Sequence, residues 1–385
     1  MKRPQVATVG CALLLALAAT VLVGCGPRKV GVTPQTPEPT PTRALEKKFK
    51  VVISTRPGQW NLDERRRGYE ETFAKYYPEI EVVQVIDDET KYEAGEREAG
   101  AVLSATPDLA AFCGLNAASG PGVAQAVKNA GKVGEVVIVA MDADSAILDL
   151  IEEGVITASV AQRQYKMSYL GVKYLFGLNH GIYRVAGDES KPDLPEIPPI
   201  LDTGTVEVNK DNVDIFRTPS QGAAEEMTEE ERTLPGGVKP EPFPDEEYVV
   251  IGISTGVEYW NATREGLKDV CEYFGIPKYE FTGPPDQNPE KQADMMDAII
   301  GRKPSGILIA PGRADTLAPY INKAIDEGIP TLTIDTDSEE SNRYSYMGTR
   351  NYEAGVMGAH ILARTLGATK VETEEEASET EAADE

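Results

Sequence analysis

Residues 51–61 read VVISTRPGQWN, and residues 251–261 read IGISTGVEYWN. The two stretches share Ile-Ser-Thr, a short loop and Trp-Asn in register, at an offset of 200 positions. The chain has two tryptophans, and each closes one of these stretches. An apolar, β-branched run that ends in a polar loop is typical of a buried strand that leads into a helix. The repeat therefore predicts two related structural units.

Short apolar runs alternate with helical patterns after each copy of the repeat. The first half predicts strands at 50–55, 80–86, 109–115, 136–142 and 156–162, and helices at 63–77, 92–105, 121–131 and 145–154. The second half predicts strands at 248–255, 278–283, 306–312, 329–337 and 344–350, and helices at 261–275, 289–302, 318–328 and 351–367. Regular alternation of this kind predicts βαβ units and parallel sheets. A chain of 385 residues accommodates two such units, so we expect an α/β fold of two doubly wound parallel-sheet lobes.

The N-terminus has the pattern of a lipoprotein signal peptide. Lys2 and Arg3 precede the apolar run CALLLALAATVLV, and LVGC ends at Cys25. Residues 1–25 are therefore predicted to be a signal peptide with a lipobox, with Cys25 as the lipid attachment site; an uncleaved membrane anchor is the alternative. Residues 26–47 are rich in Pro and Thr, which predicts an extended tether. We expect an extracytoplasmic protein anchored to the cell membrane.

The net charge of −25 is concentrated in two segments. Residues 218–248 contribute −7 and residues 371–385 contribute −8. We interpret 218–247 as a solvated acidic linker and 370–385 as a disordered acidic tail. Because no basic stripe is present, nucleic acid is not an expected partner.

The cysteines leave two possibilities open. Cys11 lies in the signal peptide, Cys113 in a predicted strand and Cys271 in a predicted helix. Two separate buried thiols are the preferred interpretation, although a disulfide is possible in an exported protein.

No metal or cofactor motif stands out. The segments at 142–145 (DADS) and 335–338 (DTDS) faintly resemble calcium loops, but neither has a glycine at position six and an acid at position twelve. P-loop, CxxC and histidine-metal spacings do not occur. We expect neither a metal nor a cofactor.

Residues 252–256 (GISTG) match the nucleophile elbow pattern around Ser254. The repeat copy keeps Ser54 but has no flanking glycines, and the chain has two histidines, His180 and His360. A serine hydrolase at Ser254 therefore stays an alternative, and our main interpretation is that the protein is not an enzyme.

Aromatic and polar side chains follow the predicted strands. Aromatic rings pack on the C–H face of a sugar, while carboxylates accept hydrogen bonds from its hydroxyls and a guanidinium donates them. Each ring can instead cover a helix as core, and each polar residue can be a helix cap or a turn residue. Their coincidence at one edge makes the following residues candidate ligand contacts: Trp60, Arg65, Asn116, Asp142, Gln162, Tyr259, Trp260, Asp335 and Thr349.

The sequence resembles the type 1 periplasmic sugar-binding proteins, the group that includes ribose-binding protein, from about 48 to 216 and from 248 to 369. The matching pieces include YWNATREGL, GVITASVAQRQYKMSYLG, TVEVNKDNVDIF and the run from ILIAPGRAD to GTRNYEAG. The resemblance implies two lobes joined by a hinge, stacking rings at Tyr259 and Trp260, and hydroxyl binding by Asp335. It implies further contacts from the other lobe and the hinge, at Arg65, Asn116, Asp142 and Gln162. Thr336, Ala117 and Met141 depart from the usual Arg, Asp and Phe, which leaves the identity of the sugar open.

The order of the pieces departs from the family. Family members begin like residues 251–261, and their GTxNYxAG helix leads into a strand like KVVIST, whereas here that helix closes the ordered chain. We expect a circular permutation, with residues 48–162, 200–216 and 350–369 forming the family's C-terminal lobe. Residues 248–349 and 163–190 would form its N-terminal lobe. Helix 350–366 should then pack on the lobe that starts at Lys48, and the helix after Gln162 on the other lobe.

The resemblance implies a solute-binding protein that delivers a small sugar or polyol to the permease of an ABC transporter. A sensory subunit for a sugar-like signal, coupled to a kinase or chemoreceptor, is the alternative with the same fold. A lactose-repressor-like regulator also shares this fold, but the signal peptide and the missing helix-turn-helix argue against it.

Overall fold

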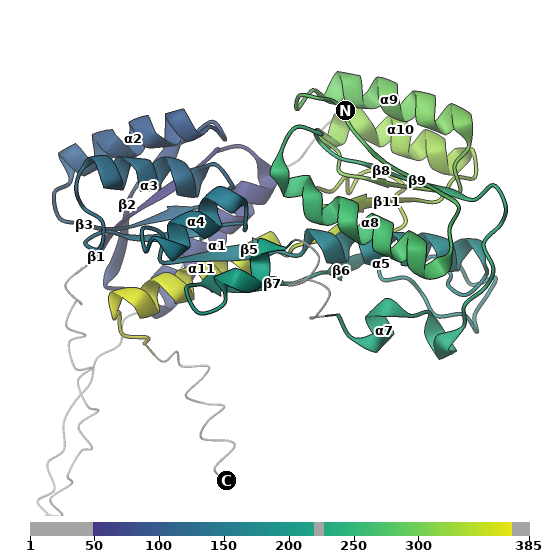
Figure 1. Ribbon diagram of the computed structural model, residues 1–385, viewed down its shortest axis with the longest axis horizontal. Helices are drawn as coiled ribbons and strands as arrows, with labels where there is room; N and C mark the ends of the chain where they lie inside the picture. Colours follow the sequence, from purple (N-terminus) through teal and green to yellow (C-terminus); the bar gives the residue numbers. More distant parts are fainter. Residues whose placement is uncertain (1–48, 219–226, 372–385) are drawn as a thin grey trace, which may run out of the picture. The chain divides into compact units, whose positions relative to one another are not determined.

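The computed structural model of the protein describes residues 49–218 and 227–371 (Figure 1). The strands form two six-stranded sheets. The first sheet contains β1 (Phe49–Thr55), β2 (Ile80–Asp87), β3 (Leu109–Gly114), β4 (Val137–Met141), β5 (Ala158–Gln162) and β7 (Thr205–Asn209). The second contains β6 (Ile200–Asp202), β8 (Glu247–Ile251), β9 (Lys278–Thr282), β10 (Gly306–Ile309), β11 (Thr331–Ile334) and β12 (Tyr346–Gly348). We call the first sheet with its helices lobe A, and the second with its helices lobe B.

The two sheets have the same doubly wound order. Lobe A runs β2-β1-β3-β4-β5-β7, and lobe B runs β9-β8-β10-β11-β12-β6. The pairings are parallel except that β7 pairs antiparallel to β5. The prediction of two parallel-sheet α/β lobes is therefore confirmed, with one antiparallel edge strand added. The fourth strands of the two lobes, β4 and β11, occupy equivalent places.

Helices cover both faces of the sheet in lobe A (Figure 1). The helical segments of this lobe are α1 (Trp60–Tyr76), α2 (Tyr92–Ala105), α3 (Ser119–Asn129), α4 (Ser145–Glu152), η1 (Val213–Arg217) and α11 (Asn351–Leu366). One core lies between the sheet and α2, α3 and α4, and the other between the sheet and α1 and α11. A sheet covered on both faces explains why its central strands are continuous apolar runs.

Lobe B is built in the same way. Its helical segments are α5 (Gln164–Asn179), α7 (Glu229–Arg232), η2 (Pro235–Gly237), η3 (Glu258–Trp260), α8 (Asn261–Phe274), α9 (Pro289–Arg302) and α10 (Ala314–Asp326). The helices α5 and α8 pack on one face of the sheet, and α9 and α10 on the other.

Each lobe contains one helix that directly follows a strand of the other lobe. After β5 of lobe A the chain crosses into α5, which packs against α8, β10 and β11 of lobe B. After β12 of lobe B it crosses back into α11, which packs against α1, β3 and β4 of lobe A. This is the packing that we expected for helix 350–366 and for the helix after Gln162. The chain also crosses between β6 and β7.

One lobe boundary predicted from the sequence was wrong. Residues 200–216 were assigned to one lobe, but β6 pairs with β12 of lobe B while β7 pairs with β5 of lobe A. The crossing therefore falls between 202 and 205. These strands have three and five residues, so their pairing depends on neighbours that are distant in the sequence.

The acidic linker 218–247 is not solvated throughout. Met227 and Leu234 are buried in the core of lobe B. Lys173 of α5 donates to the backbone carbonyls of Glu230 and Glu231, at 3.0 and 3.1 Å. The composition predicted a segment that does not pack on the fold, because its acidic residues outnumber its apolar ones. Two apolar side chains and two backbone carbonyls nevertheless attach part of it to lobe B.

The two cysteines of the described chain are free thiols. Cys113 lies in the core under α1 and α11 of lobe A, and Cys271 in the core of lobe B. This agrees with two separate buried thiols rather than a disulfide.

The predicted signal peptide, Cys25, the tether and the tail at 372–385 lie outside the described residues. Within 49–218 and 227–371, no helix has the length and hydropathy needed to cross a bilayer.

Candidate functional site

Asp142 and Asp335 occupy equivalent positions, directly after β4 and β11. Both have left-handed backbone torsions, with φ of 73° and 62°. Both are buried, at 3% and 8% exposure. A left-handed aspartate costs conformational energy, and such turns concentrate at binding and catalytic sites. The faint calcium-loop pattern in the sequence, DADS and DTDS, corresponds to these two turns, and the described residues contain no cluster suited to a metal ion.

Each of these carboxylates receives a neutral donor. Gln162 Nε2 donates to Asp142 Oδ1 at 2.8 Å, and the Tyr259 hydroxyl donates to Asp335 Oδ1 at 2.5 Å. Burial beside Asp335 raises the pKa of the Tyr259 hydroxyl well above its usual value, so Tyr259 stays a neutral donor. The remaining carboxylate lone pairs are available to hydroxyl groups of a ligand.

Arg65 supplies positive charge to both carboxylates. Its guanidinium is buried, and it donates from Nε to Asn351 Oδ1 at 2.9 Å and from Nη1 to the Leu115 carbonyl at 3.0 Å. Burial raises the pKa of Asp335 to about 6 although Arg65 and the Tyr259 hydrogen bond lower it. Burial also raises the pKa of Asp142, again opposed by Arg65.

Gln162 and Thr349 join the site to two of the lobe crossings. Gln162 ends β5 directly before α5, and Thr349 lies between β12 and α11. Thr349 Oγ1 donates to Gln162 Oε1 at 3.0 Å, and both side chains are buried. The Gln162 amide therefore makes two hydrogen bonds: its oxygen accepts from Thr349 and its nitrogen donates to Asp142.

Asn116 is engaged in a separate cluster. Its Nδ2 donates to Asp88 at 3.0 and 3.2 Å, and its Oδ1 accepts from the backbone N–H groups of Ala118 and Ser119, both at 3.0 Å. Asp88 is fully buried and also accepts from the Ser54 and Ser119 hydroxyls. The sequence reasoning missed Asp88, although it follows β2 directly and an acid at a strand end was the signal used for Asp142 and Asp335.

The three aromatic candidates lie in different environments. Tyr259 is half-buried and faces Asp335. Trp260 is 2% exposed and belongs to the core of lobe B, with its ring 5.8 Å from that of Phe281. Trp60 is 54% exposed at the start of α1. The structure therefore agrees with the alternative in which Trp260 is a core residue. The Trp260 ring also packs against the Tyr259 ring in an edge-to-face arrangement, with the ring centroids 5.1 Å apart.

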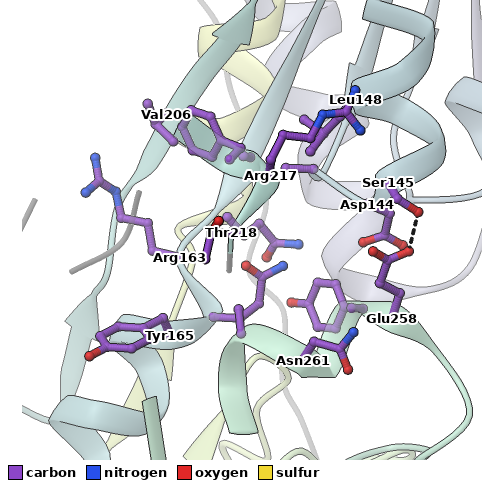
Figure 2. Close-up of a pocket in the computed structure, with 17 residues that line it drawn as sticks. Asp144, Ser145, Leu148, Arg163, Tyr165, Val206, Arg217, Thr218, Glu258 and Asn261 are labelled. Atoms are coloured by element: carbon purple, nitrogen blue, oxygen red, sulfur yellow. Dashed lines mark hydrogen bonds between the residues drawn. The ribbon is translucent and has the colours of Figure 1, made fainter. Parts of the chain in front are cut away.

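A cavity of about 150 Å³ borders the site and is lined by both lobes (Figure 2). Gln162 and Tyr259 are the two candidate residues that reach it. Figure 2 shows the carboxyl groups of Asp144 and Glu258 close to one another, and Ser145 Oγ donates to Glu258 Oε2 at 2.7 Å. Burial, together with the charges of Asp142 and Glu258, raises the pKa of Asp144 to about 7. Asp144, Ser145 and Glu258 were not predicted as site residues.

Ser254 lacks the geometry of a nucleophile. Its Oγ is buried and has no hydrogen-bond partner among the residues that the structure describes. His180 bonds to Glu246, and His360 bonds to the Tyr77 hydroxyl. A serine nucleophile needs a base within hydrogen-bond reach, so the hydrolase alternative has no support.

The structure thus brings six of the nine candidates into one connected cluster, in which Tyr259 is half-buried and the other five side chains are buried. Five are linked by hydrogen bonds: Gln162 bonds to Asp142 and to Thr349, and Tyr259 bonds to Asp335. Arg65 is tied to the cluster by its charge on both aspartates. Asn116, Trp60 and Trp260 lie outside it by these contacts.

The chain is similar to several known proteins over part of its length. The D-allose-binding periplasmic protein of Escherichia coli (strain K12) is 32% identical over 125 residues, which is 32% of this chain and 40% of that protein. A sugar-binding protein of a sugar ABC transporter from Bacillus halodurans is 34% identical, with a TM-score of 0.41 over 44% of this chain and 57% of that one. The arabinose-binding protein AraP from Geobacillus stearothermophilus is 32% identical, with a TM-score of 0.40 over 45% and 58%.

The family match extends further along the chain than these individual matches, each of which spans less than two thirds of the relative's own length. Residues 42–181 and 248–377 match the family described as periplasmic binding protein domain, which is more than half of the sequence. The matched residues include β1 to β5, β9 to β12 and all of β8 except its first residue, whereas β6 and β7 lie outside the match. The chain therefore belongs to the periplasmic binding protein family.

Proposed function

We propose that the protein is an extracytoplasmic, lipid-anchored solute-binding protein that captures a small sugar or polyol between its two lobes. It would deliver this ligand to the permease of an ABC transporter. The observation that carries the proposal is the cluster of the buried residues Arg65, Asp142, Gln162 and Asp335 with the half-buried Tyr259. It presents carboxylates, a guanidinium, an amide and an aromatic ring, which are the groups that bind hydroxyls and the C–H face of a sugar.

The chemistry of the cluster fits binding rather than conversion of the ligand. A micromolar dissociation constant corresponds to about 8 kcal/mol, which several charge-assisted hydrogen bonds and one ring contact can supply. The relative from E. coli is named for binding D-allose, which supports a monosaccharide as the class of ligand. Two lobes connected by several crossings are suited to closing around it by hinge bending.

Binding is tested by a thermal-shift screen of pentoses, hexoses and inositols, followed by calorimetry on each hit, because a ligand of the native state raises its melting temperature. Asp335→Asn should weaken binding by more than tenfold, since the carboxylate that receives the Tyr259 hydroxyl becomes an amide. Asp326→Asn, at the exposed end of α10 in the same lobe, is the matched control and should bind normally. If no sugar or polyol raises the melting temperature, the proposal fails.

Delivery and anchoring are tested in cells. Loss of the protein should abolish high-affinity uptake of the ligand identified in the screen, and Cys25→Ser should release the protein from the membrane fraction. Unchanged uptake together with a lost transcriptional or chemotactic response to the ligand would favour the sensory alternative.

We also propose that the lobe order is circularly permuted relative to the family. The described ends of the chain meet at one turn: Phe49 N–H donates to the Glu79 carbonyl at 3.1 Å, and Thr369 N–H donates to Glu79 Oε1 at 2.5 Å. A short link between α11 and β1 would therefore not disturb either element. Circular permutation is tolerated where the chain ends lie close together on the surface.

A further inference from the structure

We infer that Asn351 is a positioning residue of the ligand site, which holds the Arg65 guanidinium in place and connects it to the lobe crossings. Asn351 is the first residue of α11 and was not among the predicted site residues. The inference rests on the proposed function, because it concerns the same cluster of side chains.

The Asn351 amide is used at both ends. Its Oδ1 accepts the Arg65 Nε hydrogen bond at 2.9 Å, and its Nδ2 donates to the Thr349 carbonyl at 3.2 Å. The side chain is 3% exposed, so these bonds are made away from competing water. Arg65 has a second fixed contact, from Nη1 to the Leu115 carbonyl at 3.0 Å. The guanidinium is therefore held from α11 on one side and from the end of β3 on the other.

A close helix crossing places Asn351 within reach of Arg65. A Cβ on Gly355 would lie 2.0 Å from the Arg65 carbonyl oxygen, and a Cβ on Gly68 would lie 2.2 Å from the Tyr352 carbonyl oxygen. The backbones of α1 and α11 thus touch through these two glycines. Asn351 and Gly355 are four residues apart on the same face of α11, so the contact that needs Gly355 also directs Asn351 toward α1.

Asn351 is also the link between Arg65 and the two crossings. The hydrogen bonds run from Arg65 to Asn351, from there to the Thr349 carbonyl, from Thr349 Oγ1 to Gln162, and from Gln162 to Asp142. Thr349 precedes α11, and Gln162 ends the strand before α5. The guanidinium and the carboxylate of lobe A are therefore both fixed to the segments where the chain changes lobes.

The electrostatic role of Arg65 provides a readout that does not depend on stability. Arg65 holds down the pKa of both Asp142 and Asp335 against the effect of burial. The other charged group that acts on Asp335 and Tyr259 is Asp142. The Tyr346 hydroxyl also faces Asp335 and donates to its carbonyl at 2.9 Å; burial and the charge of Asp335 raise the pKa of Tyr346, so this group stays neutral. If Asn351 positions Arg65, removing its amide should raise the pKa of Asp335, whereas a change that only loosens the packing of α11 should not.

The experiment compares Asn351→Ala with Tyr352→Phe in the full chain. Tyr352→Phe is the matched control on the next residue, since it removes the hydrogen bond to the exposed Glu71 carboxylate and touches no site residue. We expect Asn351→Ala to weaken binding of the ligand identified in the screen about tenfold, because one charge-assisted hydrogen bond is lost. Carboxyl-carbon NMR titration of the ligand-free protein should show a higher Asp335 pKa in Asn351→Ala and an unchanged one in Tyr352→Phe.

A double-mutant cycle with Arg65→Lys separates positioning from a general effect. Lysine keeps the positive charge but has no Nε–H, so Arg65→Lys removes the same hydrogen bond that Asn351→Ala removes. The fold loss of affinity in the double variant should therefore be clearly smaller than the product of the fold losses in the two single variants. Fully additive losses together with an unchanged Asp335 pKa would overturn the inference. If Asn351→Ala does not fold, Asn351→Ser removes the amide, keeps a small polar side chain at the start of α11 and undergoes the same cycle. If no sugar binds the wild-type protein, the proposed function fails, and the Asp335 titration alone decides the role of Asn351.

Discussion

Ser145 of lobe A donates a hydrogen bond of 2.7 Å from its Oγ to Glu258 Oε2 of lobe B. The two residues are 113 positions apart and lie on the wall of the cavity beside Tyr259. Glu258 opens the short helix η3 that also carries Tyr259 and Trp260. The contact therefore connects the start of α4 to the segment that presents the aromatic ring of the proposed site.

Ser145→Ala should weaken ligand binding about threefold, because one hydrogen bond to a charged acceptor between the lobes is lost at an exposed position. Ser104→Ala is the matched control, since Ser104 is an exposed serine of lobe A whose Oγ bonds only within its own helix, to the Gly100 carbonyl at 2.9 Å. Calorimetry measures both variants. Equal affinities for the two would mean that the Ser145 contact does not contribute to the ligand-bound state.

The ligand-free protein should become more stable as the pH falls from 8 to 5.5. Burial raises the pKa of Asp144 to about 7 and that of Asp335 to about 6, above the ordinary aspartate value of 3.8. A carboxyl with a raised pKa in the folded state stabilises the fold when it is protonated, and this contribution is lost as the pH rises through the folded value. The effect should therefore be present below about pH 6 and absent above pH 7.

Thermal unfolding at several pH values checks this dependence. Asp144→Asn should flatten the profile between about pH 6 and 7, where Asp335 no longer contributes, and Asp335→Asn should reduce the slope below about pH 6. Asp326→Asn, which replaces an exposed side chain at the end of α10, is the control and should keep the wild-type profile. A profile in Asp144→Asn that matches the wild type would contradict the assignment.

The main effect of Trp260→Ala should be a loss of fold stability rather than a loss of ligand contacts. Trp260 is 2% exposed within the core of lobe B, and truncating a buried tryptophan typically costs about 3–5 kcal/mol. Trp60 is 54% exposed, so Trp60→Ala should change the free energy of unfolding by less than about 0.5 kcal/mol. Urea unfolding measures both. A stable Trp260→Ala variant that has lost binding would restore the earlier interpretation of this ring as a ligand contact.

Reversing the proposed permutation should preserve the protein. The new chain would begin at residue 227, join Val371 to Phe49 through a short glycine-serine linker and end at residue 218. The melting temperature and the ligand response should stay close to those of the parent, because Val371 N–H already bonds to the Tyr76 carbonyl beside the turn that holds Phe49. A control with the same junction but new termini at Gly328, between α10 and β11, should be strongly destabilised, since it opens a βαβ unit. Equal loss of stability in both chains would contradict the permutation.

Much of the architecture was predictable because it depends on local patterns. The parallel strands are continuous apolar runs, and the helices that follow them have periodic apolar positions, so their place in the sequence was visible without knowledge of the fold. Asp142 and Asp335 were found because each follows such a strand directly. Asp88 follows β2 in the same way, and the same rule applied to every strand would have found it.

Local sequence patterns are enough to predict the two α/β lobes, the polar residues at the strand ends and the family to which the chain belongs. The contacts of each side chain follow from the packing of the folded chain: Trp260 lies in the core, β6 belongs to lobe B, and Asn351 bonds to Arg65 across 286 positions. These outcomes depend on which distant elements pack together, above all on the approach of α1 and α11 through Gly68 and Gly355. Local periodicity shows which face of a helix is buried, but the partner on that face is set only when the whole chain folds.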